Sequence, residues 1–481
     1  MRNNSRLLTP RQIYYISTFL FFAITVSTRS VNIQPQSLIV RTLKAFAFSA
    51  IPISDRRNAQ ALRYSLWDGI FCSGMMALSD TFAIAGAVYL QIPSIAIGMI
   101  AGLPLLSGSL GQLAIANFLR PSAGRKKYVV LGTTAQSALL LLLAFTGWLP
   151  AGYRSWLYAV VFTLQGFFGT YMAGLWIAWM SSLVRPAVRG RFFARRNRII
   201  NIFQLVCGLA AGAFAFRQTA QSTSWLFFTF VFLAAGCFRF LSTIMLVKQY
   251  EPPPVLYDPG SPGSGKQDRT INSNGFLRFC FATSLMQGAV MLASPFFTVW
   301  FVRDLHFTFF TLSASTASMV LGSIVALPLW GKLSDRFGHR RVLLITGLMI
   351  AVVPLPFIFT GIPLLICCFN FYSGICWSGY NLSNFNYLLH LSDVKNPERQ
   401  TSIAMAFTGI SVFLFSLLGG FLASRLPMIA VWQLQSLFLL SSLLRFAVFG
   451  GLFLNLPHDG NKDASRITDF FQFARRLMDK V

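Results

Sequence analysis

Charged residues are scarce in this chain, and acidic residues are the scarcest of them. Asp, Glu, Lys and Arg make up 11% of the 481 residues and only 14 are acidic, whereas 55% of the chain is hydrophobic. Soluble domains rarely have such a composition. We therefore expect lipid, rather than water, to surround most of the protein.

Residues that commonly bind metals are also few. The sequence contains four histidines and seven cysteines, and every cysteine lies inside an apolar segment. None has the paired spacing of a zinc site, so we interpret the cysteines as packing residues and predict no metal and no cofactor. A G-x-x-x-x-G-K-[ST] loop is absent as well, which excludes ATP hydrolysis by a nucleotide-binding loop of that type.

Basic residues, in contrast, are abundant. The chain has 40 Lys and Arg and a formal net charge of +26. A nucleic-acid-binding protein would gather them on one face or arm. Here they alternate along the chain with apolar segments, which is typical of loops on the cytosolic side of a membrane. We therefore predict a lipid bilayer as a partner, and no nucleic acid.

The apolar residues form twelve segments of about 20 residues or more, the length a helix needs to cross a hydrocarbon core. Because the bilayer offers no hydrogen-bond partners to the backbone, each segment is expected to be a helix. The sequence thus predicts an all-α integral membrane protein. The expected spans are 64–90, 93–118, 128–149, 156–184, 198–216, 224–247, 275–301, 308–330, 342–361, 362–391, 401–424 and 430–456.

The distribution of Lys and Arg predicts the orientation of these spans. One set of alternate loops and span ends holds twenty of these residues, whereas the opposite set holds only Arg154, Arg217, Arg303 and Arg425. By the positive-inside rule, the first set and both chain ends face the cytosol. We expect a multi-pass, monomeric protein of the inner cell membrane.

Two halves of six spans are predicted on either side of a Pro-, Gly- and Ser-rich linker. Seven pairs of residues recur between the halves at offsets of 205 to 208, among them Gly212 with Gly420 and Arg239 with Arg445. Parallel duplication of this kind builds transporters whose substrate path lies between the repeats. The predicted parts are a basic extension 1–63, the halves 64–247 and 275–456, the cytosolic linker 248–274 and a cytosolic tail 457–481.

The first 63 residues allow several interpretations. They contain a short apolar stretch, 13–26, and no acidic residue up to Ile53. A disordered or membrane-surface extension is the favoured interpretation. An additional crossing or signal-like segment, an organelle presequence and a misplaced start codon stay open.

The segment GKLSDRFGHRR lies between the eighth and ninth predicted spans, as a short hairpin loop whose glycines let the backbones approach. It resembles the signature loop of the major facilitator superfamily, with His339 as a departure, and the twelve-span plan extends the resemblance over about 64–456. The resemblance implies that Asp335 and nearby arginines form an ion-pair latch on the cytosolic face, closed in one state and open in the other. The alternative is that the loop only sets topology. The motif residues are Gly331, Asp335, Arg336, Gly338, Arg340 and Arg341.

The first half has a counterpart that begins at Gly111, with Ile115 in place of the aspartate, so the resemblance implies only one latch of this kind. A second basic cluster, RGRFFARRNR, is predicted to join the fourth and fifth spans. With the preceding WIAWMSSLVRP, it resembles a pattern in poorly characterised bacterial facilitators. It serves either as an anchor to anionic lipid or as a gate contact. Its candidate residues are Arg189, Arg191, Arg195 and Arg196.

Charged side chains inside spans are costly and are functional candidates by default. Asp80 lies near the middle of the first span, and Asp68 lies close enough to its start to reach the cytosolic interface. We take both as candidates for proton coupling, with Asp80 the better one and a structural carboxyl as the alternative. Arg239 and Arg445 occupy matching positions of the two halves, which favours a shared structural role.

Neutral polar residues mark a candidate substrate cavity. The tenth span is the most polar, and Asn381 and Asn384 share one of its faces. Amides and aromatic rings suit a polar organic solute, although amides also hold helices together in lipid. The candidate cavity residues are Gln165, Trp176, Gln287, Tyr380, Asn381 and Asn384.

The function expected from these features is secondary-active transport of a small organic solute by alternating access, with proton coupling as one energy source. No convergent set of catalytic residues is evident, so we predict that the protein is not an enzyme. Two alternatives are kept: a facilitator-fold sensor or scaffold that has lost transport, and, less favoured, a polytopic membrane enzyme.

Overall fold

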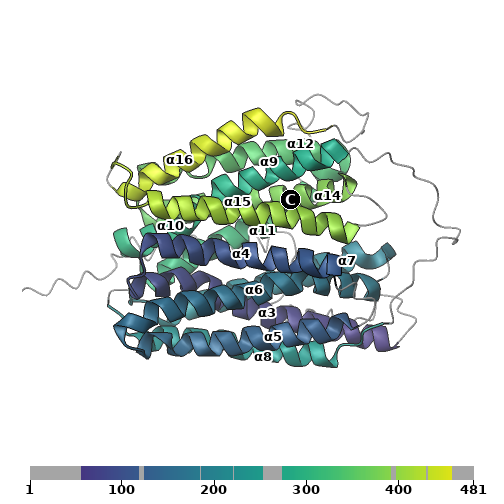
Figure 1. The fold of residues 1–481 in the computed structure, drawn as a ribbon, viewed down its shortest axis with the longest axis horizontal. Helices are drawn as coiled ribbons and strands as arrows, with labels where there is room; N and C mark the ends of the chain where they lie inside the picture. The colour runs from purple at the N-terminus through teal and green to yellow at the C-terminus, as the bar shows by residue number, and fades with distance from the viewer. Residues whose placement is uncertain are drawn as a thin grey trace, which may run out of the picture. The chain divides into compact units, whose positions relative to one another are not determined.

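The structure is a computed structural model, and it describes residues 56–118, 124–184, 186–219, 222–252, 273–391, 397–428 and 432–457. These residues are almost entirely helical (Figure 1). Within them, the β-structure is a single antiparallel bridge between Thr219 and Thr308. The expected all-α fold is confirmed.

Six membrane-length helices form the first half, and a 3-10 turn, η1 (Thr146–Trp148), extends the third of them. The fifth helix begins with proline. The first N–H groups of a helix have no partner within the helix, so a residue without an N–H costs no hydrogen bond at this position. The helices are α3 (Arg56–Tyr89), α4 (Ser94–Phe118), α5 (Arg125–Phe145), α6 (Ala151–Leu183), α7 (Pro186–Phe214) and α8 (Trp225–Lys248).

The second half also contains six spans, but three of them are interrupted or change their helical pitch. Its seventh span consists of α9 (Ser273–Met291), α10 (Ser294–Val299) and the π-helical turn η2 (Trp300–Asp304), and its twelfth consists of α16 (Gln433–Val448) and η3 (Phe449–Phe453). The other elements are α11 (Phe309–Phe337), α12 (His339–Val352), α13 (Pro356–Phe359), α14 (Pro363–Leu391) and α15 (Pro397–Leu422).

The described residues contain eleven helices that are long and apolar enough to cross a membrane. The remaining span, α14, has 29 residues and belongs to the segment that the sequence marks as the most polar. Together the elements give the predicted twelve spans in two halves. Within the first half, α3 packs on α7 and α8, whereas in the second half α14 packs on α11 and α12.

The two halves meet through a pair of symmetry-related helix contacts, α4 with α15 and α7 with α11. The repeat residues Gly212 and Gly420 lie in these contacts. A Cβ at Gly420 would lie 2.6 Å from the carbonyl oxygen of Ser94, and one at Gly212 would lie 2.9 Å from that of Phe309. Each half therefore places its fifth helix against the second helix of the other half, and these glycines allow the close approach.

Replacing Gly420 by alanine is expected to weaken this contact. The added methyl group would press on the α4 backbone, and overpacking of this kind costs about 1–3 kcal/mol. The melting temperature of the purified protein in detergent should fall. Gly451→Ala is the control, because a Cβ there meets no atom within 4 Å; equal melting temperatures for the two variants would contradict the packing described.

Three predicted boundaries are wrong. The helix that contains the first span, α3, begins at Arg56, and the apolar span within it begins at Gln60 rather than Tyr64, while residues 1–55 lie outside the described part. Residues 331–337 form the last two turns of α11, and the basic cluster 189–198 lies within α7. Both segments were expected to be loops because they are polar, but a helix can extend beyond the apolar core without changing its hydrogen bonding.

Candidate functional site

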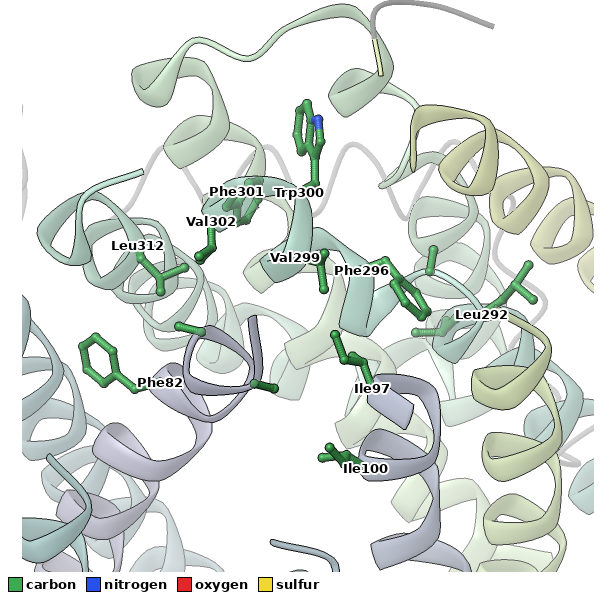
Figure 2. Close-up of a cluster of buried hydrophobic side chains, with 14 of the residues drawn as sticks. Phe82, Ile97, Ile100, Leu292, Phe296, Val299, Trp300, Phe301, Val302 and Leu312 are labelled. Carbon is green, nitrogen blue, oxygen red and sulfur yellow. The ribbon is translucent and has the colours of Figure 1, made fainter. Parts of the chain in front are cut away.

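An apolar seal, a cluster of buried side chains, joins the two halves (Figure 2). It lies near the ends of α3 and α11 that are far from the basic loops. At its centre the ring of Phe309, on α11, stacks on Phe227 at 4.4 Å and meets Phe82 of α3 edge-on at 5.8 Å. These side chains are almost completely buried, so the seal excludes water from this end of the interface. The seal residues labelled in the figure are Phe82, Ile97, Ile100, Leu292, Phe296, Val299, Trp300, Phe301, Val302 and Leu312.

Backbone contacts reinforce the seal. The amide of Phe309 donates to the carbonyl of Gln218 at 3.0 Å, next to the bridge between Thr219 and Thr308. The rings of Phe216 and Phe310 lie 4.9 Å apart. These hydrogen bonds and ring contacts between the halves all lie at this face.

The GKLSDRFGHRR motif, residues 331–341, lies at the face of the basic loops, called the basic face below. Gly338 separates α11 from α12 with φ 88° and ψ 151°, a conformation that requires glycine. Gly331 lies in open surroundings, since a Cβ there would meet no atom within 4 Å. The close backbone approach expected of both glycines is therefore not found at Gly331, and Gly338 is required for its positive φ instead.

Asp335 is exposed in the last turn of α11, and within the described part of the chain it forms no ion pair. A carboxylate at a helix C-terminus is slightly destabilising because it faces the negative end of the helix dipole. The neighbouring motif residues have other contacts. Arg340 donates from Nε to the carbonyl of Leu456 at 2.9 Å, and Ser334 pairs with the ring of His339 at 2.6 Å.

A buried polar network crosses the first half. Asp68, which is 4% exposed, accepts a 2.7 Å hydrogen bond from Ser242 of α8 and lies 3.6 Å from the guanidinium of Arg196 of α7. Arg196 also donates to the carbonyl of Ser65 and lies over the ring of Trp176 at 4.6 Å. Asp68 therefore does not reach the interface as expected, but fixes α7 and α8 against α3.

The network continues through the second arginine of this half. Arg239 donates to Ser242 at 3.1 Å and, from Nε, to Gln136 at 2.7 Å. Gln136 in turn donates to Gln165 of α6 at 3.2 Å. The carboxylate of Asp68 therefore balances the charge of two buried guanidinium groups, those of Arg196 and Arg239. Hydrogen bonds and charge connect five helices, α3, α5, α6, α7 and α8.

Asp80 has a different environment. It is exposed, and its one described hydrogen bond comes from the adjacent Ser79, at 3.0 Å. Around the axis of α3, Asp80 lies between Ala77 and Thr81, about 60° from the first and about 100° from the second. The neighbouring Ala77 and Thr81 line a hollow between α3, α7 and α11. This places Asp80 at the interface between the halves.

Comparison with known proteins agrees with this architecture. The family model described as Major Facilitator Superfamily matches residues 279–476. A D-xylose–proton symporter of known structure has a TM-score of 0.64 at 12% identity, covering 84% of this chain and 98% of its own. The second half of the chain thus matches the major facilitator superfamily, a family of membrane transporters. Because the described residues also contain eleven helices long and apolar enough to cross a membrane, this facilitator is a multi-pass membrane protein.

Two further similarities are more limited. A bacterial homologue of the human lysosomal transporter Spinster, in an inward-facing and unoccupied conformation, has a TM-score of 0.60 at 13% identity and covers 89% of this facilitator and 99% of its own chain. Solute carrier family 22 member 6 of Pseudopleuronectes americanus is 32% identical over 137 residues, 28% of this chain. The match spans about a quarter (24%) of that relative's length.

The six candidate cavity residues of this facilitator do not form one group. Gln165 is buried in the polar network, and Trp176 lies against Arg196. Tyr380 is fully buried among Trp377 and Phe453, whereas Asn381, one residue further on, is exposed. Gln287 and Asn384 are half-buried, and the amide oxygen of Asn384 has no partner.

The candidate residues of the basic cluster also have different environments. Arg196 is buried, whereas Arg195 is exposed one residue before it. The side chains of Arg189 and Arg191 lie outside the described residues. In the described part of the chain, no group of three His, Cys, Asp or Glu side chains is placed to hold a metal ion.

Arg445, the repeat partner of Arg239, is 2% exposed and is bound by carbonyls rather than by a carboxylate. It donates to Ile350 at 3.0 Å and to Val290 at 3.4 Å. Pro354 lacks the amide that would bond to the Ile350 carbonyl in a continuous helix, and this carbonyl accepts from Arg445 as well as from the amide of Val353. The two arginines occupy matching positions in the halves, but their hydrogen-bond partners differ.

The polar groups of the hollow were missed from the sequence. They are Thr81 of α3, Gln204 of α7, and Ser313 and Thr316 of α11. Serine and threonine are common in membrane helices and form bonds to their own backbone, so their number alone carries no signal. Asp80, a neighbour of Thr81, was a candidate from the sequence, but none of the residues that line the hollow was.

Proposed function

We propose that this facilitator is a secondary-active transporter that carries a small organic solute across the inner membrane by alternating access. The observation that carries the proposal is the asymmetry of the contacts between the halves. Aromatic rings and hydrogen bonds join them at one face, whereas Asp335 is exposed and unpaired among the described residues at the other. A carrier held closed on one side and released on the other has this arrangement.

The basic face is the cytosolic face in this proposal, since it carries the excess of Lys and Arg. The arrangement then corresponds to a state closed to the outside. The similar structure described as inward-facing and unoccupied supports this assignment. Both chain ends lie in the cytosol, and we expect a monomer without catalytic activity.

Energy for transport comes from an ion gradient in this proposal, with Asp80 as the group that carries the proton. Asp80 is exposed beside the interface of the halves, where access changes from one face to the other. The similar fold of a structure described as a D-xylose–proton symporter supports this part of the proposal. Asp68 is a weaker candidate, because its negative charge balances buried arginines.

The Asp335 latch predicts a shift in conformational population. An exposed ion pair that forms only when the basic face closes contributes about 0.3–1 kcal/mol, so Asp335→Ala should favour the open state by about two- to fivefold. A cysteine introduced at the exposed Asn381 should then react faster with an impermeant thiol reagent added from the basic side. Lys332→Ala, which alters another exposed charge of α11, is the control. Equal labelling rates for Asp335→Ala and the parent protein would argue against the latch.

The proposed function is tested with purified protein in liposomes that carry an imposed proton gradient. A transporter moves at least one member of a panel of neutral, cationic and anionic organic solutes faster than empty liposomes do. A sensor or scaffold moves none of them, and that outcome would overturn the proposal.

A further inference from the structure

The hollow between α3, α7 and α11 lies directly beneath the seal. Thr81 on its wall precedes the seal residue Phe82 in the sequence, and Ser313 follows the seal residue Leu312. The hollow is therefore the end of the space between the halves on the closed side. A group bound there contacts both halves.

The chemistry of the wall is polar but uncharged. Thr81, Gln204, Ser313 and Thr316 provide hydroxyl and amide groups. The rest of the wall is apolar and consists of Ala77, Leu205, Gly208, Ala317 and Val320. A wall of this kind matches a ligand group that forms hydrogen bonds without carrying a charge.

Ser313 provides the second observation. Its side chain is 2% exposed, and its hydroxyl has no hydrogen-bond partner. Ser315, on the same helix and equally buried, donates instead to the carbonyl of Leu312 at 2.9 Å. A buried hydroxyl without a partner is destabilising, so its presence in the wall of a hollow points to a partner supplied by a ligand.

Gly208 keeps the hollow open. A Cβ at Gly208 would approach only that of Ala77, at 3.9 Å, whereas a Cβ at Gly212, one turn further along α7, would overlap with Ser313. Gly212 therefore allows close packing of α7 on α11, whereas Gly208 does not. The missing side chain at Gly208 leaves free space.

The hollow has a volume of about 20 Å³. A cavity needs roughly 10–15 Å³ to hold one water molecule, whereas complete pockets for organic ligands occupy roughly 300–1,000 Å³. The hollow therefore has room for one group of about the size of a hydroxyl, and not for a whole solute.

We propose that this hollow binds an uncharged hydrogen-bonding group of the transported solute, and that the substrate is a neutral hydroxylated molecule. The inference rests on the proposed transport function and assigns its substrate class. A hydroxyl of the solute bonds to Ser313, with Thr81, Gln204 and Thr316 completing its hydrogen bonds. Because the same residues adjoin Phe82 and Leu312, occupancy of the hollow acts directly on the seal.

The test uses D-xylose, uridine and myo-inositol as neutral probes, with choline and benzoate as charged ones. Binding is measured by the shift in melting temperature of the purified full-length protein, and transport by uptake into liposomes. At least one neutral probe should raise the melting temperature and be taken up. Ser313→Ala should weaken its binding by about 3- to 10-fold, because one hydrogen bond is lost.

Two variants separate binding from folding. Ser315→Ala is the matched control and should bind the neutral probe as the parent does. Gly208→Leu fills the hollow and should abolish neutral-probe binding. Without ligand, Ser313→Ala should melt no lower than the parent protein, since it removes a hydroxyl that had no partner.

Three outcomes would overturn the inference. Binding and uptake of charged probes alone would contradict the substrate class and leave the transport function intact. Equal neutral-probe affinity in Ser313→Ala and the parent would contradict the site. Uptake of no solute, in this set or in the broader panel, would overturn both the inference and the proposed function.

Discussion

Asp80→Asn is expected to abolish uptake driven by a proton gradient while leaving exchange of solute across the membrane without a gradient intact. Asparagine has nearly the size of a protonated aspartate but cannot release a proton. Asp80 is exposed at the interface of the halves, and its one described hydrogen bond is with Ser79. The substitution therefore removes the charge without disturbing buried partners.

Both rates are measured in the same liposomes, with a solute identified in the uptake panel. Gradient-driven uptake should fall to the level of empty liposomes, whereas exchange of labelled for unlabelled solute should persist. Asp304→Asn is the control, because Asp304 pairs with the exposed Arg303 next to it in the sequence and lies outside the hollow. Undiminished gradient-driven uptake in Asp80→Asn would exclude Asp80 as the proton carrier.

Asp68→Ala is expected to cause the largest loss of stability. It would leave the buried guanidinium groups of Arg196 and Arg239 without their shared carboxylate. Removing one partner of a buried ion pair costs about 3–5 kcal/mol. We therefore expect the purified yield and the melting temperature in detergent to fall sharply.

The matched control is Asp304→Ala. It breaks the other ion pair between described residues, in which the Arg303 side chain is 46% exposed, and exposed pairs contribute at most about 1 kcal/mol. Asp68→Asn keeps an acceptor for Ser242 but loses the charge, so its melting temperature should lie between those of the parent and Asp68→Ala. If Asp68→Ala melted at the parent temperature, the network would not hold α3, α7 and α8 together as described.

The helical spans and the two halves were predictable because apolar length and basic-residue alternation act locally along the chain. The repeat pair Gly212 and Gly420 even indicated the contacts between halves, since glycine at equivalent helix positions marks a close approach. Whether a segment is helix or loop was less predictable where a helix extends beyond the membrane. Residues 331–337 and 189–198 are polar, and their polarity reflects water exposure rather than a loop.

The candidate site was only partly predictable. Asp80 and Asp68 were identifiable because charge in a span is costly, but their different roles depend on side chains from other helices. Ser242, Arg196 and Arg239 surround Asp68, and no spacing in the sequence relates them to it. In the same way, nothing local distinguishes Ser313 from Ser315, although only Ser315 has a hydrogen-bond partner.

Alternating access is the central claim, and a cross-link of the seal tests it without a known substrate. Thr219 and Thr308 face each other in the bridge between the halves, so a pair of cysteines there should form a disulfide in a background free of other cysteines. A third cysteine at Thr81, in the hollow, reports access from either side through impermeant thiol reagents. Oxidation is expected to restrict its labelling to the basic side, whereas the reduced protein should be labelled from both sides. Labelling from the opposite side that persists after oxidation, or that is absent in both states, would contradict the account.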